Sequence, residues 1–237
     1  MDFSGKTVLV AGGTGGLGRA VSLAFLESGA DVAVTYRNPD EFAALQESAG
    51  NGRTRLMGHA LDVTDPDAVS PVIGSILAQR GHLNILVNTV GGYTGGTKLW
   101  ETDPSALERM VALNLRAGFV LSRAVVPTML KQGRGVIVNI AAKAALFPAA
   151  GGGVYAASKA AALAMLESLA AEVKGTGVRV NSILPSIIDT EPNRKAMPKA
   201  DFSKWPKPEQ IARVILFLCS DDAKVIHGAA IPVYGDS

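Results

Sequence analysis

The chain has 237 residues, of which 48% are hydrophobic and 19% are charged. This composition supplies ample apolar material for a core and lacks the signature of a disordered protein. The 23 basic and 21 acidic residues are scattered along the chain, so we expect no nucleic-acid partner. The single cysteine, Cys219, cannot form an intramolecular disulfide and is expected to be a small buried hydrophobe. No metal site is expected.

The N-terminus has no apolar segment of signal-peptide length, and no run approaches the roughly 18 apolar residues of a membrane span. We therefore expect a soluble cytoplasmic protein with no membrane partner.

Apolar runs of strand length alternate with longer helix-like segments along the whole chain. The runs, apolar at nearly every position, are typical of strands buried on both faces of a parallel sheet. Strands are predicted at 7–12, 30–36, 53–62, 83–88, 135–140 and 178–184, and helices at about 16–28, 39–49, 65–80, 104–131, 153–174 and 208–219. This alternation predicts an α/β fold, a doubly wound parallel sheet with helices on both faces.

No linker interrupts this pattern, so we expect a single domain over residues 1–237. The least regular part, 190–210, holds four prolines and mixed charge and cannot form a long helix. A loop of this length in a compact domain is usually functional. We expect a substrate lid at about 186–210.

A glycine-rich segment, AGGTGGLG, leads from the first predicted strand into the first helix. The spacing is G-x-x-x-G-x-G at Gly12, Gly16 and Gly18. Glycines let the backbone turn tightly beside a pyrophosphate, whose charge the free N–H groups of the helix start attract. We expect Thr14 and Leu17, within this segment, to contact the same cofactor. The alternative is a glycine-rich turn that binds no ligand.

The end of the second strand discriminates between nicotinamide cofactors. An acidic residue there binds the ribose 2′-hydroxyl of NAD, whereas an arginine accommodates the 2′-phosphate of NADP. This chain has Arg37 and Asn38 at that point, and its nearest acid, Asp31, lies at the beginning of the strand. NADPH is therefore favoured over NADH. The alternative is that Arg37 is an ordinary solvated charge.

Tyr155 and Lys159 stand four residues apart on a predicted helix, so their side chains share one face. A neighbouring ammonium favours tyrosinate and is expected to lower the pKa of Tyr155 from about 10. Tyr155 is thus a candidate proton donor to a substrate that receives hydride. Alone, this spacing is common by chance.

Further motifs follow one another in the order found in the short-chain dehydrogenase/reductase family, which the chain resembles over essentially all its length. After the glycine motif come Asp62-Val63, then Asn88-Thr89-Val90-Gly91, Asn114, Tyr155-Ala156-Ala157-Ser158-Lys159, Pro185-Ser186, Ile188 and Thr190. The resemblance implies a Rossmann fold with Tyr155 as proton donor and Lys159 on the nicotinamide ribose. It also implies that Asn114 supports a water chain to Lys159, and that the other motifs contact the cofactor.

The family also has a catalytic serine thirteen residues before the tyrosine, where this chain has Ala142. In one branch, the quinonoid dihydropteridine reductases, that position is likewise alanine. The chain resembles this branch at AAKAAL (141–146), GGYTGG (91–96) and DTEPNRKAMPKADFSKW (189–205). The likeness implies a flat, conjugated, imine-like substrate that accepts hydride readily.

A pterin-like ring would be flanked by Tyr93 and Phe147 near the cofactor and by Trp205, Phe202 and Met197 in the lid. The alternative for these side chains is core packing.

Two departures from that branch widen the choice of substrate. Its members carry an acid after the second strand and lack the asparagine that this chain has as Asn114. A different pterin, a quinone or a reactive carbonyl is therefore also a candidate substrate.

Two other functions stay open. One is a general carbonyl or 3-oxoacyl reductase, disfavoured by Ala142. The other is an NADP-sensing binding protein on the same fold, for which a proton donor would be superfluous. The alanine-rich helix at 153–174 permits close helix packing, and family likeness implies a homodimer or homotetramer.

Overall fold

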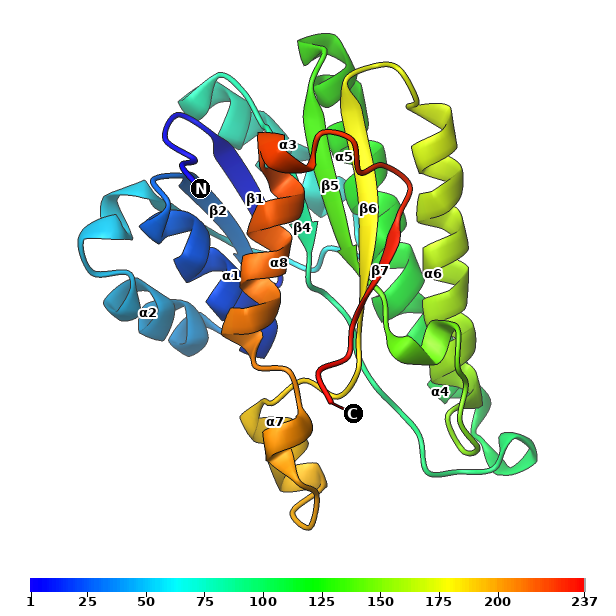
Figure 1. Ribbon diagram of the computed structural model, residues 1–237. Coiled ribbons are helices and arrows are strands. Elements are labelled where there is room, and N and C mark those ends of the chain that lie inside the picture. The colour runs from blue at the N-terminus through cyan, green and yellow to red at the C-terminus, as the bar shows by residue number, and fades with distance from the viewer. Residues whose placement is uncertain (237) are drawn as a thin grey trace.

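The computed structural model describes residues 1–236, and its centre is one sheet of seven strands (Figure 1). The strands are β1 (Thr7–Ala11), β2 (Asp31–Tyr36), β3 (Leu56–Ala60), β4 (Ile85–Asn88), β5 (Gly135–Ile140), β6 (Val178–Pro185) and β7 (Ala230–Val233). They lie in the order β3-β2-β1-β4-β5-β6-β7, and every pair is parallel. The order reverses between β1 and β4, so a crevice opens there at the carboxyl ends of the strands. The predicted doubly wound Rossmann fold is confirmed.

Helices cover both faces of the sheet. They are α1 (Gly16–Glu27), α2 (Pro39–Ser48), α3 (Pro66–Arg80), α4 (Pro104–Val111), α5 (Ala117–Gln132), α6 (Gly153–Glu172), α7 (Glu191–Ala196) and α8 (Pro208–Cys219). The core on one face combines apolar residues of α1 and α8, and the core on the other combines those of α3, α5 and α6. Asn38, Asp65 and Asp103 cap α2, α3 and α4, each followed by a proline, which suits the first helical position.

Two elements differ from the prediction. The single helix expected at 104–131 is α4 and α5 joined by a π-helical turn, Ala112–Arg116, that contains Asn114. Strand β7 was not predicted, because its four residues include Pro232 and lie only partly buried at the edge of the sheet.

By length and composition alone, the helical stretch Pro104–Gln132 and helix α6 are apolar enough to cross a membrane. No apolar run of that length was expected from the sequence. In this fold both helices cover the sheet, and their buried residues belong to its core.

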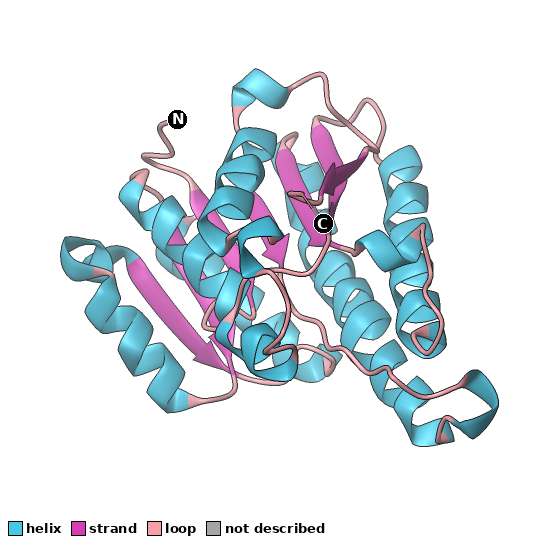
Figure 2. Cartoon of the chain, turned by 60° about the horizontal axis from the view of Figure 1, so that its bottom comes forward, coloured by secondary structure: helices cyan, strands magenta, loops and turns pink. Residues whose placement is uncertain are grey.

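The carboxyl ends of the strands gather the loops that were predicted to be functional. The segment after β6, which carries α7, projects from this edge, and the long loop between β4 and α4 lies at the same edge (Figure 1). Figure 2 brings this edge of the molecule forward.

Candidate active site

The glycine-rich loop turns from β1 into α1 at the crevice. The Gly12 N–H donates a 2.9 Å hydrogen bond to Thr35 Oγ1, and the Gly13 N–H donates a 3.1 Å bond to the Thr35 carbonyl, so β2 anchors the loop. A Cβ atom at Gly18 would lie 2.1 Å from the Gly12 carbonyl oxygen, so only glycine permits this turn. Helix α1 has no side-chain cap, and its first N–H groups are open to an anion.

Beside this loop lies a cleft of about 280 Å³. It is lined by Gly12, Thr14, Gly15, Thr35, Tyr36, Arg37, Asn38, Glu41, Leu61, Asp62, Val63, Thr89, Val90, Gly91 and Leu113. The structure therefore brings together the predicted cofactor residues of the glycine loop, of the end of β2 and of the loops after β3 and β4. The four segments are far apart in sequence, and the sheet makes them neighbours.

Asn88 was expected to contact the cofactor, but it does not line this cleft. The side chain is buried, where its Nδ2 donates a 3.0 Å hydrogen bond to Asn139 Oδ1 and its Oδ1 accepts from the Val90 N–H at 3.2 Å. Asn88 therefore links the loop after β4 to the neighbouring strand β5. Thr89, the next residue of the same motif, lines the cleft and donates a 2.6 Å hydrogen bond to the Ala11 carbonyl.

The start of the predicted lid crosses the glycine loop. The methyl group of Thr190 lies against Gly16, and Ile188 packs on the core beneath α1 and α8. Both residues follow Pro185, the last residue of β6. Thr190 therefore lies at the start of α1.

Lys159 on α6 is buried, and its Nζ donates a 2.8 Å hydrogen bond to the Ile140 carbonyl at the end of β5. Burial lowers the pKa of Lys159 to about 8. A Cβ atom at Gly91 would lie 3.1 Å from Lys159 Nζ and 2.9 Å from Asn114 Oδ1. Glycine at position 91 thus lets the side chains of Lys159 and Asn114 approach the loop after β4 closely.

Tyr155 lies one turn before Lys159, half-buried at the mouth of the site. Its pKa is raised to about 12, first by burial and second by the nearby Tyr93 hydroxyl. The two rings stand edge to face, with 4.9 Å between their centroids and 73° between their planes. The sequence led us to expect that Lys159 lowers this pKa, but burial and Tyr93 raise it instead.

Asn114 lies in the π-helical turn, which directs it inward toward the loop after β4. Its Oδ1 accepts from the Gly92 N–H at 2.9 Å, and its Nδ2 lies 3.0 Å from the Gly92 carbonyl and 2.9 Å from Ser158 Oγ. Ser158 Oγ in turn donates to the Tyr155 carbonyl at 2.7 Å. The side chain therefore ties α6, and with it the tyrosine, to the loop that forms the floor of the site.

Ala141 and Ala142 follow β5 and are both buried, and neither side chain offers a hydroxyl. The short turn Lys143–Ala145 after them packs on α6. The Lys143 ammonium lies over the ring of Tyr234, 4.9 Å from its centroid. At position 142, where the family has its substrate-polarising serine, this chain therefore has a small apolar side chain.

The residues proposed to flank a substrate ring fall into two groups. Tyr93 and Phe147 are exposed, 71% and 62% respectively, so their rings are available to a ligand. Trp205 is only 6% exposed and packs on Phe202 with 4.9 Å between ring centroids. Its role as a substrate wall is corrected to packing within the lid.

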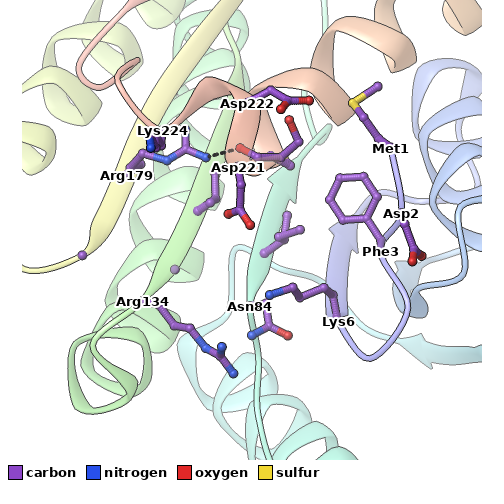
Figure 3. A pocket seen from close by; sticks show the side chains of 16 residues that line it. Met1, Asp2, Phe3, Lys6, Asn84, Arg134, Arg179, Asp221, Asp222 and Lys224 are labelled. Atoms are coloured by element: carbon purple, nitrogen blue, oxygen red, sulfur yellow. Dashed lines mark hydrogen bonds between the residues drawn. The ribbon is translucent and has the colours of Figure 1, made fainter.

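A second cavity, of about 500 Å³, lies at the opposite edge of the sheet (Figure 3). Lys6, Asn84, Arg134 and Arg179 line it from the starts of strands, together with Asp221 beyond α8. Its size does not make it the reactive site, because Tyr155 and Lys159 stand at the carboxyl ends of the strands.

A helix start without a side-chain cap and a tyrosine followed one turn later by a buried lysine, both at one edge of the sheet, are typical of a nucleotide-dependent oxidoreductase. Residues 6–201 match the short chain dehydrogenase family. The chain belongs to this family, as its motifs predicted.

Several relatives match along their whole length. The chain is 30% identical to the 3-oxoacyl-(acyl-carrier-protein) reductase of Thermotoga maritima, covering 99% of this chain and 98% of the relative. It is 34% identical to the D-threitol dehydrogenase of Mycolicibacterium smegmatis, covering 99% and 94%. Among solved structures, the L-sorbose reductase of Gluconobacter frateurii, complexed with NADPH and L-sorbose, is 28% identical with a TM-score of 0.90, covering 99% and 97%.

Proposed function

We propose that the protein is an NAD(P)H-dependent reductase of a conjugated substrate that is itself electrophilic, such as a quinonoid dihydropteridine. Ala142 carries this proposal: it is buried two residues after Ile140, whose carbonyl accepts from Lys159, and it has no hydroxyl to polarise a carbonyl. A substrate whose ring already delocalises incoming charge has the least need of that donor. The exposed rings of Tyr93 and Phe147 at the same mouth suit a flat molecule.

Two features of the cleft support a dinucleotide cofactor. The open helix start suits a pyrophosphate, and Gly91 leaves room beside Lys159 for a ribose. Arg37 lines the cleft, and among residues 1–236 it forms no ion pair, which supports a preference for NADPH over NADH. The nicotinamide, when bound, supplies the hydride.

The side chains of the site have complementary tasks in this proposal. Tyr155 keeps its proton throughout the physiological range, because its pKa is raised to about 12, and it donates that proton to the reduced substrate. Lys159 holds a ribose hydroxyl and, when charged, eases loss of the tyrosine proton. Asn114 is a positioning residue, since it acts through Gly92 and Ser158.

A general carbonyl or 3-oxoacyl reductase is the second candidate. The full-length similarity to the Thermotoga maritima reductase favours it, whereas the alanine at position 142 disfavours it. A nucleotide-sensing protein without activity is the third candidate. Retention of Tyr155, Lys159 and Asn114 at one edge of the sheet speaks against that reading, because a sensor has no need of a proton donor.

We also propose a cytoplasmic homodimer or homotetramer built on α6. Small residues form an exposed stripe along this helix, at Ala157, Ala161, Ala164, Ser168 and Ala171. Leu107, Val111 and Phe119 on the neighbouring α4 and α5 are also exposed. Such a surface allows two helices to approach closely and buries apolar area on association.

Steady-state oxidation of NADPH and NADH by the native protein tests the proposal, with quinonoid dihydrobiopterin and a saturated 3-oxoacyl thioester as rival substrates. The non-enzymatic rate is subtracted in each case. We expect turnover with the pterin and little with the thioester. The reverse order would establish the second candidate, and nucleotide binding without turnover on either would favour the third.

A further inference from the structure

Glu41 enters the cofactor cleft from a helix that the sequence motifs do not mark. It lies in the first turn of α2, and its carboxylate lines the same cleft as Arg37 and Asp62. A glutamate in a first helical turn ordinarily serves the helix dipole or its cap. Here Asn38 already caps the helix through the Asp40 N–H. The Glu41 side chain instead reaches the glycine loop.

A hydrogen bond fixes this position. Thr14 Oγ1, in the glycine loop, donates to Glu41 Oε2 at 2.8 Å, although the residues are 27 positions apart in sequence. Thr14 is buried, so its hydroxyl has little freedom to turn elsewhere. Among residues 1–236, the other carboxylate oxygen, Oε1, accepts no side-chain hydrogen bond. This cleft-lining residue thus keeps one carboxylate oxygen that can accept a hydrogen bond.

The cleft therefore holds charges of both signs near the end of β2. Asp62 has its pKa lowered mainly by hydrogen bonds from Thr64, with a smaller contribution from Arg37, which places the guanidinium within electrostatic reach of Asp62. Arg37 attracts a 2′-phosphate, and the Glu41 carboxylate repels one. A carboxylate at this end of the cleft also suits the 2′-hydroxyl of an unphosphorylated ribose.

We propose that Glu41, oriented by Thr14, reads the 2′ position of the cofactor's ribose and opposes Arg37, so that the protein accepts NADH as well as NADPH. This inference rests on the proposed function, because it assigns selectivity to the same cofactor cleft. Arg37 by itself would give a strong preference for NADPH over NADH. The Glu41 carboxylate reduces that preference.

Equilibrium binding tests this assignment without any turnover. Dissociation constants for NADPH and NADH are measured by calorimetry, together with those for adenosine 2′,5′-bisphosphate and AMP, which report on the adenosine end alone. Glu41→Gln is the main variant, because glutamine keeps an oxygen for Thr14 and removes only the charge. Glu47→Gln is the matched control: it removes the same charge from α2, from an exposed residue outside the cleft.

In Glu41→Gln we expect the affinity for NADPH relative to NADH to rise roughly tenfold, as removal of a like charge at close range predicts. The bisphosphate should gain relative to AMP in the same way, and the gain should shrink in high salt. Arg37→Gln should move both ratios in the opposite direction, and Glu47→Gln should leave them unchanged.

If the native protein binds nucleotide and Glu41→Gln leaves the NADPH-to-NADH affinity ratio unchanged, the role of Glu41 is overturned and the proposed function is not. An equal shift in Glu47→Gln would also overturn this role, because net charge would then be the cause. If the native chain bound neither dinucleotide, the proposed function would fail with it.

Discussion

Lys159 Nζ donates its 2.8 Å hydrogen bond to the carbonyl of Ile140, two residues before Ala142. The buried lysine is therefore held by the end of β5, and the polypeptide that continues from this anchor carries the alanines in place of a catalytic serine. One short segment therefore carries two separate features: the carbonyl that holds Lys159 and the position from which a hydroxyl would polarise the substrate. This chain has the carbonyl and lacks the hydroxyl.

Restoring the hydroxyl should change the substrate range. In Ala142→Ser, a side chain of nearly the same volume gains a donor, and kcat/KM for a saturated 3-oxoacyl thioester should rise roughly ten- to hundredfold. Turnover of quinonoid dihydrobiopterin should change much less. Ala141→Ser is the matched control from the adjacent buried position. Equal effects on both substrates would refute the link between Ala142 and substrate choice.

Burial of Lys159 predicts a distinctive pH dependence of stability. Its pKa is about 8 in the folded protein against the ordinary lysine value of 10.5, so between these pH values the unfolded chain binds more protons. The free energy of unfolding should therefore rise with pH, by up to about 1.4 kcal/mol per unit. Below pH 8 the cost of burying the charge is fully present.

The useful window is pH 8 to 9. Cys219 and Tyr155 have their pKa raised to about 12 from 9.0 and 10.0, so each contributes a loss of stability only above its unfolded value. Urea unfolding at pH 8 and 9 should show the rise in the native protein without cofactor and its absence in Lys159→Met. The same slope in both proteins would contradict the assignment.

Asn114 should matter more to turnover and stability than to cofactor selectivity. Asn114→Ala leaves the Gly92 N–H and Ser158 Oγ without their shared partner, which should cost about 1–3 kcal/mol of unfolding free energy. We expect kcat to fall more than nucleotide affinity. Ser158→Ala, which removes one of these bonds, should have a smaller effect on both. A loss of affinity alone would show that Asn114 acts on the cofactor directly.

Tyr93 should help to keep the pKa of Tyr155 high. Its ring covers the catalytic ring edge to face, so Tyr93→Leu should expose Tyr155 and lower its pKa toward the ordinary value. The high-pH limb of kcat/KM should then move to lower pH, and less so in Tyr93→Phe, which keeps the ring. Trp100→Leu, at an exposed aromatic residue on the same loop, should leave the limb in place. Identical profiles in all four proteins would remove Tyr93 from the account.

Apolar runs that alternate with helix-like segments predicted six of the seven strands. The motifs at the ends of these runs predicted the edge of the sheet where the site lies. What escaped prediction depends on contacts between distant residues. The raised pKa of Tyr155 needs burial and the ring of Tyr93, and the charge balance at the cofactor cleft needs the Thr14–Glu41 bond. Trp205 lies in a proline-rich, charged segment, so nothing local indicated that it packs inward.

The most direct test of the central claim compares the native protein with Tyr155→Phe in NADPH oxidation by quinonoid dihydrobiopterin, with nucleotide affinity measured on both. The substitution removes one hydroxyl and leaves the ring in place. We predict that turnover falls by about 10²- to 10⁴-fold, the usual contribution of a general acid, while NADPH affinity changes little. Native turnover that survives in Tyr155→Phe would contradict proton donation by this tyrosine.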